Sequence, residues 1–352
     1  MSPAQQSEGV LARYGHLLPL AAETPRLTLN EGSTPLLEAP RLAAWVGVER
    51  LYLKFEGMNP TGSFKDRGMV VAVAKAIEGG AGTVLCASTG NTAASAAAYA
   101  ARAGLRAVVV LPGGKVAPGK VAQAVMYGAR IVVLDANFDV ALALAREAAA
   151  VTNAALVNSV NPYRIEGQTT AAYEICDTLG EAPDLLALPV GNGGNITAYG
   201  LGFMRYRDFG RTARLPRLLG VQAAGAAPFV LGHPVENPET VATAIRIGRP
   251  ATWEPALAAA RDSQGAIRAA SDDEILEAYH EIAHREGVFC EPASAAGVAG
   301  LRAAVRHGDV DGRGISVCVL TGNGLKDPDS ALATGVDLVH RPATLEALVA
   351  EI

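Results

Sequence analysis

Short apolar runs that recur at a nearly regular interval constrain the fold of this chain most strongly. From residue 83 they are spaced by roughly two dozen residues, with alanine-rich segments of helical character between them. These runs comprise residues 84–87, 107–111, 131–134 and 154–157. Strands that are apolar on both faces and alternate with helices form a parallel sheet covered on both sides. The pattern therefore predicts a doubly wound α/β unit.

Further strands are predicted on either side of this unit, although the spacing there is wider and the helices are longer. They are expected at residues 51–55, 185–190, 218–221, 266–268 and 315–320. A chain of 352 residues is long enough for two packed domains or for one large α/β domain. Residues 224–264 are rich in Gly, Pro and Ala and show the weakest periodicity, and we expect this span to cover a site.

The composition excludes several classes of protein. Half of the residues are hydrophobic and only 18% are charged, which favours a large core and argues against general disorder. The net charge of -5 and the lack of clustered Lys and Arg argue against a nucleic-acid partner. The four cysteines are scattered, which is typical of reduced thiols. Without a signal-like start or a membrane-length apolar run, the chain is expected in the cytoplasm with no membrane partner.

Lys65 is the leading candidate for the chemical centre. It follows a predicted strand and a turn that contains Pro60 and Gly62, and Ser63 is expected to cap a helix that extends to about residue 79. An amine at a helix N-terminus has a lowered pKa because the helix dipole disfavours a cation there, and this favours nucleophilic chemistry. Taken alone, however, a solvated charge beside Asp66 and Arg67 is the commoner role for such a lysine.

Four polar or glycine-rich clusters follow predicted strands, at the carboxyl ends where ligands bind in doubly wound sheets. They are residues 88–92, 158–164, 191–197 and 321–327. The first suits a carboxylate at a helix N-terminus, although an ordinary N-cap explains it too. The glycines of the third suit a phosphate, although a tight turn without a ligand is an equal alternative; neither the P-loop nor the dinucleotide fingerprint is present. The second offers amide, hydroxyl and guanidinium donors for another anion.

Together these residues resemble the ordered motifs of the threonine synthase family, which are pyridoxal-phosphate enzymes of the fold-type-II (tryptophan synthase β-like) group. The resemblance runs from about residue 30 to 330. The motifs that carry it are residues 62–68, 88–92, 191–195, 291–295 and 321–326. The Phe before Lys65 and the Thr-Gly-x-Gly-Leu-Lys run at the end point to this family within the group.

The resemblance implies two doubly wound domains with mostly parallel sheets and an active site in the cleft between them. Residues 1–60 and 160–352 would form a large cofactor-binding domain, and residues 61–159 a small domain inserted in it. The same resemblance implies a homodimer.

The resemblance also assigns roles to residues. Lys65 would bind the aldehyde of pyridoxal 5'-phosphate, Asn91 the ring hydroxyl, and Thr321 the pyridine nitrogen. A neutral hydroxyl at that nitrogen would make the ring a weaker electron sink. The cofactor phosphate would be held by Gly191, Asn192, Gly193, Gly194 and Asn195. The substrate carboxylate and phosphate would be bound by Ser88, Thr89, Thr92, Asn158, Ser159 and Arg164, with Lys115 or Lys120 nearby.

The implied reaction is γ-elimination followed by β-hydration of O-phospho-L-homoserine, which yields L-threonine and phosphate. The main alternative is a pyridoxal-phosphate ammonia-lyase that acts on threonine or serine. A nonenzymatic binding protein that holds an anion in its glycine loops is a further alternative. His280, Glu281 and His284 match the H-E-x-x-H spacing of zinc peptidases, but only Glu291 follows as a possible third ligand, so we expect no metal.

Overall fold

Two sheets form the framework of the computed structural model, which describes residues 8–113, 118–333, 335 and 339–351, without the side chains of 118–120 and 138. The larger sheet has six strands, whose spatial order is β1 (Leu36–Glu38), β2 (Arg50–Phe55), β10 (Ile315–Leu320), β7 (Leu185–Pro189), β8 (Arg217–Ala223) and β9 (Ala266–Ala270). All neighbours are parallel except β1 and β2. This agrees with the predicted mostly parallel architecture.

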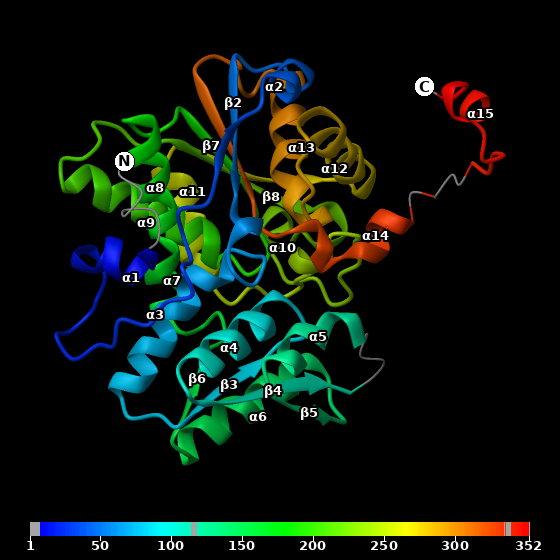
Figure 1. Ribbon diagram of the computed structural model, residues 1–352. Coiled ribbons are helices and arrows are strands. Elements are labelled where there is room, and N and C mark those ends of the chain that lie inside the picture. The colour runs from blue at the N-terminus through cyan, green and yellow to red at the C-terminus, as the bar shows by residue number, and fades with distance from the viewer. Residues whose placement is uncertain (1–7, 114–117, 334, 336–338, 352) are drawn as a thin grey trace.

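The smaller sheet is wholly parallel and comes from one continuous part of the chain. Its spatial order is β5 (Arg130–Leu134), β4 (Arg106–Pro112), β3 (Thr83–Ala87) and β6 (Ala154–Leu156). Figure 1 shows this sheet with its helices in the lower half of the molecule and the six-stranded sheet in the upper half. The regular apolar pattern of the sequence thus corresponds to one structural unit.

Helices connect the strands and cover both faces of each sheet. In chain order they are α1 (Gly9–Arg13), α2 (Pro40–Val46), α3 (Lys65–Glu78), α4 (Asn91–Arg102), α5 (Pro118–Met126), α6 (Phe138–Val151), α7 (Pro162–Gln168), α8 (Thr170–Leu179), α9 (Gly194–Asp208), α10 (Pro228–Leu231), α11 (Trp253–Asp262), α12 (Asp272–Glu286), α13 (Pro292–Arg306), α14 (Pro328–Leu332) and α15 (Leu345–Val349). Short 3-10 turns are η2 (Gly15–Leu17), η3 (Glu56–Met58), η4 (Ala224–Ala226), η5 (Thr243–Ile245) and η6 (Gly324–Lys326).

Alternation along the strands divides the core into layers. On β7, Leu185 and Ala187 pack toward α2, α12 and α13, while Leu186 and Leu188 pack toward α8, α9 and α11. In the smaller sheet, the two faces are covered in the same way by α3, α4 and α5 on one side and α6 on the other. Burial on both faces explains why these strands read as uninterrupted apolar runs. Among the described helices, none combines the length and the apolar character that a membrane span requires.

The start of α3 differs from the sequence-based expectation. The N-cap residue is Phe64 rather than Ser63, and no side chain caps the helix. Ser63 is fully buried, lies one residue before the N-cap, and accepts only a long hydrogen bond at Oγ from Lys65 N (3.4 Å), so its prediction as the N-cap is wrong. The helix nevertheless starts at Lys65, as the dipole argument requires, and is followed by Gly79.

Close contact between α3 and α7 depends on two glycines. A Cβ atom on Gly68 would lie 2.4 Å from the carbonyl oxygen of Arg164, and one on Gly167 would lie 2.0 Å from that of Arg67. Real Cβ atoms do not approach backbone oxygens so closely, because packed interiors leave no room for the overlap. The backbones of α3 and α7 can therefore touch only because both positions lack a side chain.

Candidate active site

Three neighbouring strands of the larger sheet, β2, β10 and β7, end beside one another and lead into the predicted site segments. The turn before α3 is joined to the segment after β10 by backbone hydrogen bonds from Phe64 N to Thr321 O (3.0 Å) and from Asn323 N to Gly62 O (2.9 Å). Parallel strands place their carboxyl ends at one edge of a sheet. Lys65 and Thr321 are thereby held in adjacent segments although they are far apart in the sequence.

Lys65 has the electrostatic setting of a reactive amine. Burial, together with the nearby cation of Arg164, lowers its pKa to about 7, while the carboxylate of Glu291 acts in the opposite direction. Its Nζ lies 4.2 Å from the centre of the Phe64 ring. An amine with a pKa near neutrality is substantially uncharged at physiological pH, so it can act as a nucleophile and exchange protons.

Glu291 links the predicted site residues, and sequence analysis did not assign it this position. Its carboxylate accepts hydrogen bonds from Asn91 Nδ2 at 3.2 and 3.1 Å, and its backbone N donates to Gly322 O at 3.0 Å. Burial raises the pKa of this carboxyl group. The residue precedes α13 within the motif 291–295, and that motif was the available signal. Through Glu291, Asn91 at the start of α4 is thus linked to the segment after β10.

Thr321 sits at the carboxyl end of β10 with its hydroxyl group held in place. Its Oγ1 lies 3.0 Å from Ser294 Oγ, and Ser294 Oγ accepts a hydrogen bond from Gly322 N at 2.9 Å. Thr321 and Ser294 are both buried. Direct contacts therefore connect the segments that carry Lys65, Asn91 and Thr321 around Glu291.

The glycine-rich loop after β7 leads directly into α9. Gly193 has a φ of 86°, a conformation that glycine adopts without strain, and α9 begins at Gly194. Asn195 Nδ2 is buried without a hydrogen-bond partner among the described residues. Free N–H groups at a helix N-terminus attract anions, and the unpartnered amide adds a further donor. The loop therefore has the chemistry of a phosphate site.

Part of the weakly periodic span 224–264 packs over this loop. Asn192 accepts hydrogen bonds from Thr252 N at its carbonyl oxygen (3.1 Å) and from Ala251 N at its side-chain oxygen (3.2 Å). A Cβ atom on Gly191 would lie 3.2 Å from the Cα atom of Ile245. We call residues 245–252 the covering segment. That this span covers a site stays a prediction, because the contacts show only that it packs over the loop.

The segment after β3 places hydroxyl groups at the start of α4. Ser88 Oγ accepts a hydrogen bond from Gly90 N at 3.3 Å. The hydroxyl groups of Thr89 and Thr92 have no hydrogen-bond partner within the described part of the chain, and both residues are partly exposed. These two groups are available to a ligand, as the sequence-based hypothesis requires.

The segment after β6 contributes one fully bonded side chain and one that is only partly bonded. Asn158 uses both of its amide atoms on the backbone of Ala87, at 2.9 and 2.8 Å, which fastens the ends of β3 and β6 together. Arg164 is 1% exposed, donates from Nη1 to Val157 O at 2.9 Å, and leaves Nε without a partner in the described structure. Burial lowers its pKa to about 10. Contacts of Asn158, Ser159 and Arg164 with a substrate stay predictions.

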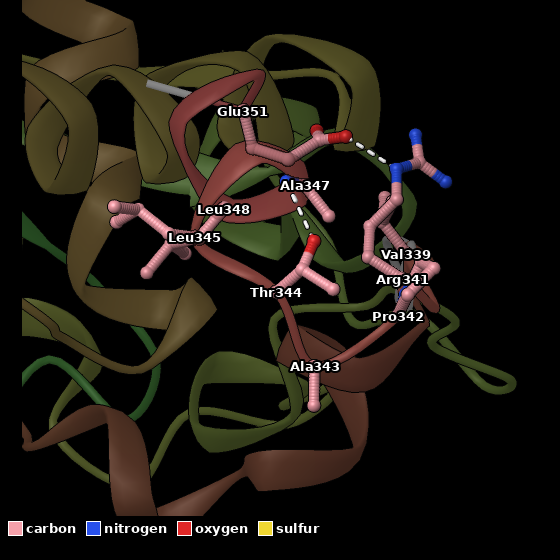
Figure 2. Close-up of a pocket in the computed structure, with 9 residues that line it drawn as sticks. All are labelled: Val339, Arg341, Pro342, Ala343, Thr344, Leu345, Ala347, Leu348 and Glu351. Carbon is pink, nitrogen blue, oxygen red and sulfur yellow. Dashed lines mark hydrogen bonds and ion pairs between the residues drawn. The ribbon is translucent and has the colours of Figure 1, made fainter.

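The remaining candidates lie elsewhere. His280 and His284 stack on α12 with ring centres 6.1 Å apart, and among the described residues no group of three or more potential ligands could hold a metal ion. Lys115 and the side chain of Lys120 lie outside the described residues. A cavity of about 440 Å³ lies in the C-terminal segment, and the residues that line it, drawn in Figure 2, include no predicted site residue.

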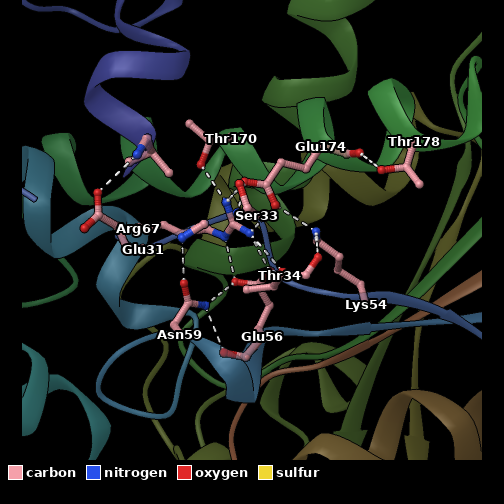
Figure 3. A network of polar contacts seen from close by, with 12 residues as sticks. Glu31, Ser33, Thr34, Lys54, Glu56, Asn59, Arg67, Thr170, Glu174 and Thr178 are labelled. Carbon is pink, nitrogen blue, oxygen red and sulfur yellow. Dashed lines mark hydrogen bonds and ion pairs between the residues drawn. The ribbon is translucent and has the colours of Figure 1, made fainter. Parts of the chain in front are cut away.

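A buried charge network lies beside the site and was missed by the sequence analysis. Arg67 donates two hydrogen bonds to Glu56 (2.7 and 2.8 Å) and two to Glu174 (2.8 and 2.6 Å), and Figure 3 shows its guanidinium group between them. Lys54 Nζ donates to Glu174 Oε2 and to Thr34 O, each at 2.8 Å. Arg67 and Asp66 are both 0% exposed, which contradicts the alternative that places Lys65 among solvated charges.

Comparison with known proteins identifies the family. Residues 27–322 match the family model described as pyridoxal-phosphate dependent enzyme. Threonine synthases of Synechocystis sp. and Mycobacterium tuberculosis are 56% and 59% identical, over 94% and 92% of this chain and 86% and 90% of those proteins. The chain belongs to the threonine synthase family of pyridoxal-phosphate dependent enzymes.

Solved structures of other pyridoxal-phosphate enzymes share the fold of this threonine synthase family member. A T.th. threonine deaminase has a TM-score of 0.68 and 28% identity, with 82% of this chain and 92% of that chain covered. Maize serine racemase has a TM-score of 0.73 and 23% identity, with 86% and 91% covered, and this likeness shows the fold alone.

The residues of the site fit pyridoxal phosphate, the cofactor of this family. The cofactor presents an aldehyde, a ring hydroxyl, a ring nitrogen and a phosphate. The structure offers an amine of lowered pKa at Lys65, and its unpartnered Asn195 amide lies at a helix N-terminus where a phosphate can bind. Which atom contacts which part of the cofactor stays a prediction.

Proposed function

We propose that the protein is a threonine synthase that converts O-phospho-L-homoserine and water into L-threonine and phosphate. The observation that carries this proposal is 50–59% identity to curated threonine synthases over 92–98% of the chain. Two features of the site supply the chemistry that such a reaction needs. They are the Lys65 amine with its pKa near neutrality and the buried, incompletely bonded guanidinium group of Arg164.

Lys65 acts as the proton carrier in this proposal. Bound pyridoxal phosphate supplies an aldehyde for amines and a conjugated ring that takes up negative charge from the substrate. Lys65 Nζ removes the proton from the substrate α-carbon and returns protons during the later shift at the β-carbon. A pKa of about 7 suits both directions of transfer, because the proton is neither held too tightly nor released too readily.

Two separate anion sites then orient the reactants. The N-terminus of α9, with residues 191–195, holds the cofactor phosphate, and Asn91 and Thr321 flank the ring. Arg164 binds the phosphate that leaves from the γ-carbon, because a buried and incompletely bonded guanidinium group gains most from an anion. Ser88, Thr89 and Thr92 bind the α-carboxylate, and Asn158 and Ser159 border the leaving phosphate.

The test is a product assay on the purified holoenzyme. O-phospho-L-homoserine should yield threonine and phosphate in equal amounts. Release of ammonia and a keto acid from threonine or serine, without phosphate release from O-phospho-L-homoserine, would instead establish the ammonia-lyase alternative. A visible spectrum before and after borohydride shows whether the cofactor is bound to an amine; a colourless protein after addition of pyridoxal phosphate would contradict the cofactor assignment.

We also propose the domain division, a homodimer and a cytoplasmic location. All four strands of the smaller sheet come from residues 83–156, and α3 packs in the same core, which supports a small domain of residues 61–159 inserted between 1–60 and 160–352. The homodimer rests on the family resemblance, and the location rests on the sequence-based expectation. Light scattering of the purified protein measures the first, and fractionation of the source cells measures the second.

A further inference from the structure

Lys326 ends the motif that begins at Thr321, and the proposed reaction gives it no role. Its Nζ donates a hydrogen bond to Thr61 O at 3.1 Å and another to Gln123 Oε1. Gln123 Nε2 approaches the same carbonyl oxygen of Thr61 at 3.4 Å. We call these three hydrogen bonds the cross-sheet contact.

The three residues belong to three segments, two of which, the turn before α3 and the segment after β10, are also joined by backbone hydrogen bonds. Lys326 lies in η6, after β10 of the larger sheet, whereas Gln123 lies on α5, whose neighbouring residues Val121 and Ala124 pack in the core of the smaller sheet. Thr61 lies in the turn that precedes Lys65. Figure 1 shows α5 in the lower half of the molecule, together with β3 and β4. The cross-sheet contact therefore connects both sheets to the turn before the reactive amine.

The hydrogen bonds of the cross-sheet contact are strengthened by the charge and the partial burial of Lys326. Burial lowers the pKa of Lys326, while the carboxylates of Glu291 and Asp66 act in the opposite direction. No described carboxylate lies within ion-pair distance of its Nζ, and the two groups that accept its hydrogen bonds are neutral oxygens. Hydrogen bonds from an ammonium group are stronger than those between neutral groups, and partial burial strengthens them further.

We propose that Lys326 and Gln123 are positioning residues that set the place of Lys65 relative to both sheets. This proposal rests on the proposed function only for its activity measurements. Asp66, the residue after Lys65, accepts hydrogen bonds from Thr61 N and Thr61 Oγ1 at 2.7 and 2.6 Å, so a displacement of Thr61 is passed directly to the start of α3. Because a misplacement of about 1 Å can cost roughly a hundredfold in rate, loss of the contact lowers kcat more than it raises KM.

A double-mutant cycle on the holoenzyme tests whether the two side chains act as one unit. Lys326→Met keeps the aliphatic chain and removes the ammonium group, and Gln123→Leu keeps the volume and removes the amide. Each single variant should lower kcat about tenfold or more, and the double variant should be no slower than the slower single variant. Losses that multiply in the double variant would overturn the proposal, since they indicate independent contacts.

Amide hydrogen exchange provides a measurement that does not need the reaction. In the holoenzyme, both single variants and the double variant should raise the exchange of α5 amides by the same factor, about tenfold or more, relative to α13. Lys75→Met, which removes another partly buried lysine that pairs with Glu78 on the same helix, is the matched control and should change neither exchange nor kcat. Unchanged α5 exchange would overturn the proposal even if activity falls. A wild type inactive on O-phospho-L-homoserine would overturn the proposed function and leave this exchange test intact.

Discussion

Two buried arginines on contacting helices differ in how completely their guanidinium groups are hydrogen-bonded. Arg67 on α3 is 0% exposed and bonds two carboxylates and two threonine hydroxyl groups, whereas Arg164 on α7 is 1% exposed and bonds one backbone carbonyl. Burial of a charge is costly unless partners compensate for it. The network around Arg67 is complete without a ligand, and the guanidinium group of Arg164 is not. The buried charge of Arg164, a proposed site residue, is therefore only partly compensated, whereas the buried charge of Arg67 in the neighbouring scaffold is fully compensated.

Two lysines repeat the contrast. Burial lowers the pKa of both Lys54 and Lys65, but Lys54 Nζ donates to Glu174 and to a carbonyl oxygen. No hydrogen bond from Lys65 Nζ to another described residue is present. An amine without partners is reactive and contributes little to stability. The comparison predicts that mutations in the two groups separate activity from stability.

The largest expected effect is on activity, from Lys65→Ala. The variant should lose about 10⁴-fold or more in kcat, because the proton carrier is removed. Its free energy of unfolding as apoenzyme should be unchanged or higher, since a desolvated, unpaired amine is lost. Steady-state kinetics and urea denaturation measure the two quantities. A stability loss as large as that of an Arg67 variant would contradict the contrast between the two groups.

The next largest effect is on stability, from Arg67→Met. Glu56 and Glu174 would lose their shared cation, and breaking a buried ion pair in this way costs about 3–5 kcal/mol. Urea denaturation measures the loss. Arg207→Met is the control, because the Arg207–Asp208 pair is exposed and such pairs contribute about 0–1 kcal/mol. Should Arg67→Met fail to fold, Lys54→Met removes a smaller part of the same network and should be intermediate.

A smaller effect is expected for Arg164→Met. If Arg164 binds the leaving phosphate, kcat/KM for O-phospho-L-homoserine should fall about 10- to 100-fold, as expected for charge-assisted hydrogen bonds. The free energy of unfolding should fall by less than about 1 kcal/mol, because only one backbone hydrogen bond is lost. Kinetics that stay unchanged while stability falls would assign Arg164 to the scaffold instead.

The smallest effect concerns pH. The rate at which apoenzyme captures pyridoxal phosphate should rise about tenfold per pH unit below a pKa of about 7 and level off above it, because the neutral amine is the nucleophile. Glu291→Gln should move the midpoint to lower pH, since the carboxylate of Glu291 favours the protonated amine. Stopped-flow absorbance at several pH values measures both midpoints. A midpoint near that of an ordinary lysine would contradict the electrostatic account of Lys65.

Much of the fold could be predicted from the sequence because buried parallel strands have a simple signature. The apolar run 315–320 coincides with β10, and the run 107–111 lies within β4. Strand order could not be read from local pattern, since β10 pairs with β2 across most of the chain. The predicted N-cap of α3 was wrong by one residue: the N-cap is Phe64, and the backbone of the preceding Ser63 is bridged to the distant Gly322.

The candidate site was predictable where residues follow strands and not where distant charges meet. Lys65, Asn91 and Thr321 each follow a readable strand or begin a readable helix, and the structure brings their segments together. Glu291 had a motif but no local signal for its contact with Asn91. The partners of Arg67 come from residues as distant as Glu174, so nothing in the linear pattern distinguishes a buried network from surface charges.

The two missing side chains at Gly68 and Gly167 have a consequence for how the enzyme can change. They allow α3 and α7 to pack closely enough to move as one rigid unit, in which the backbone carbonyl oxygen of Arg164 contacts the helix that starts with Lys65. The amine and the guanidinium group consequently travel together whenever that unit shifts. A methyl group introduced at either contact would push α3 and α7 apart, and would alter the spacing between the Lys65 amine and the Arg164 guanidinium group without replacing either residue.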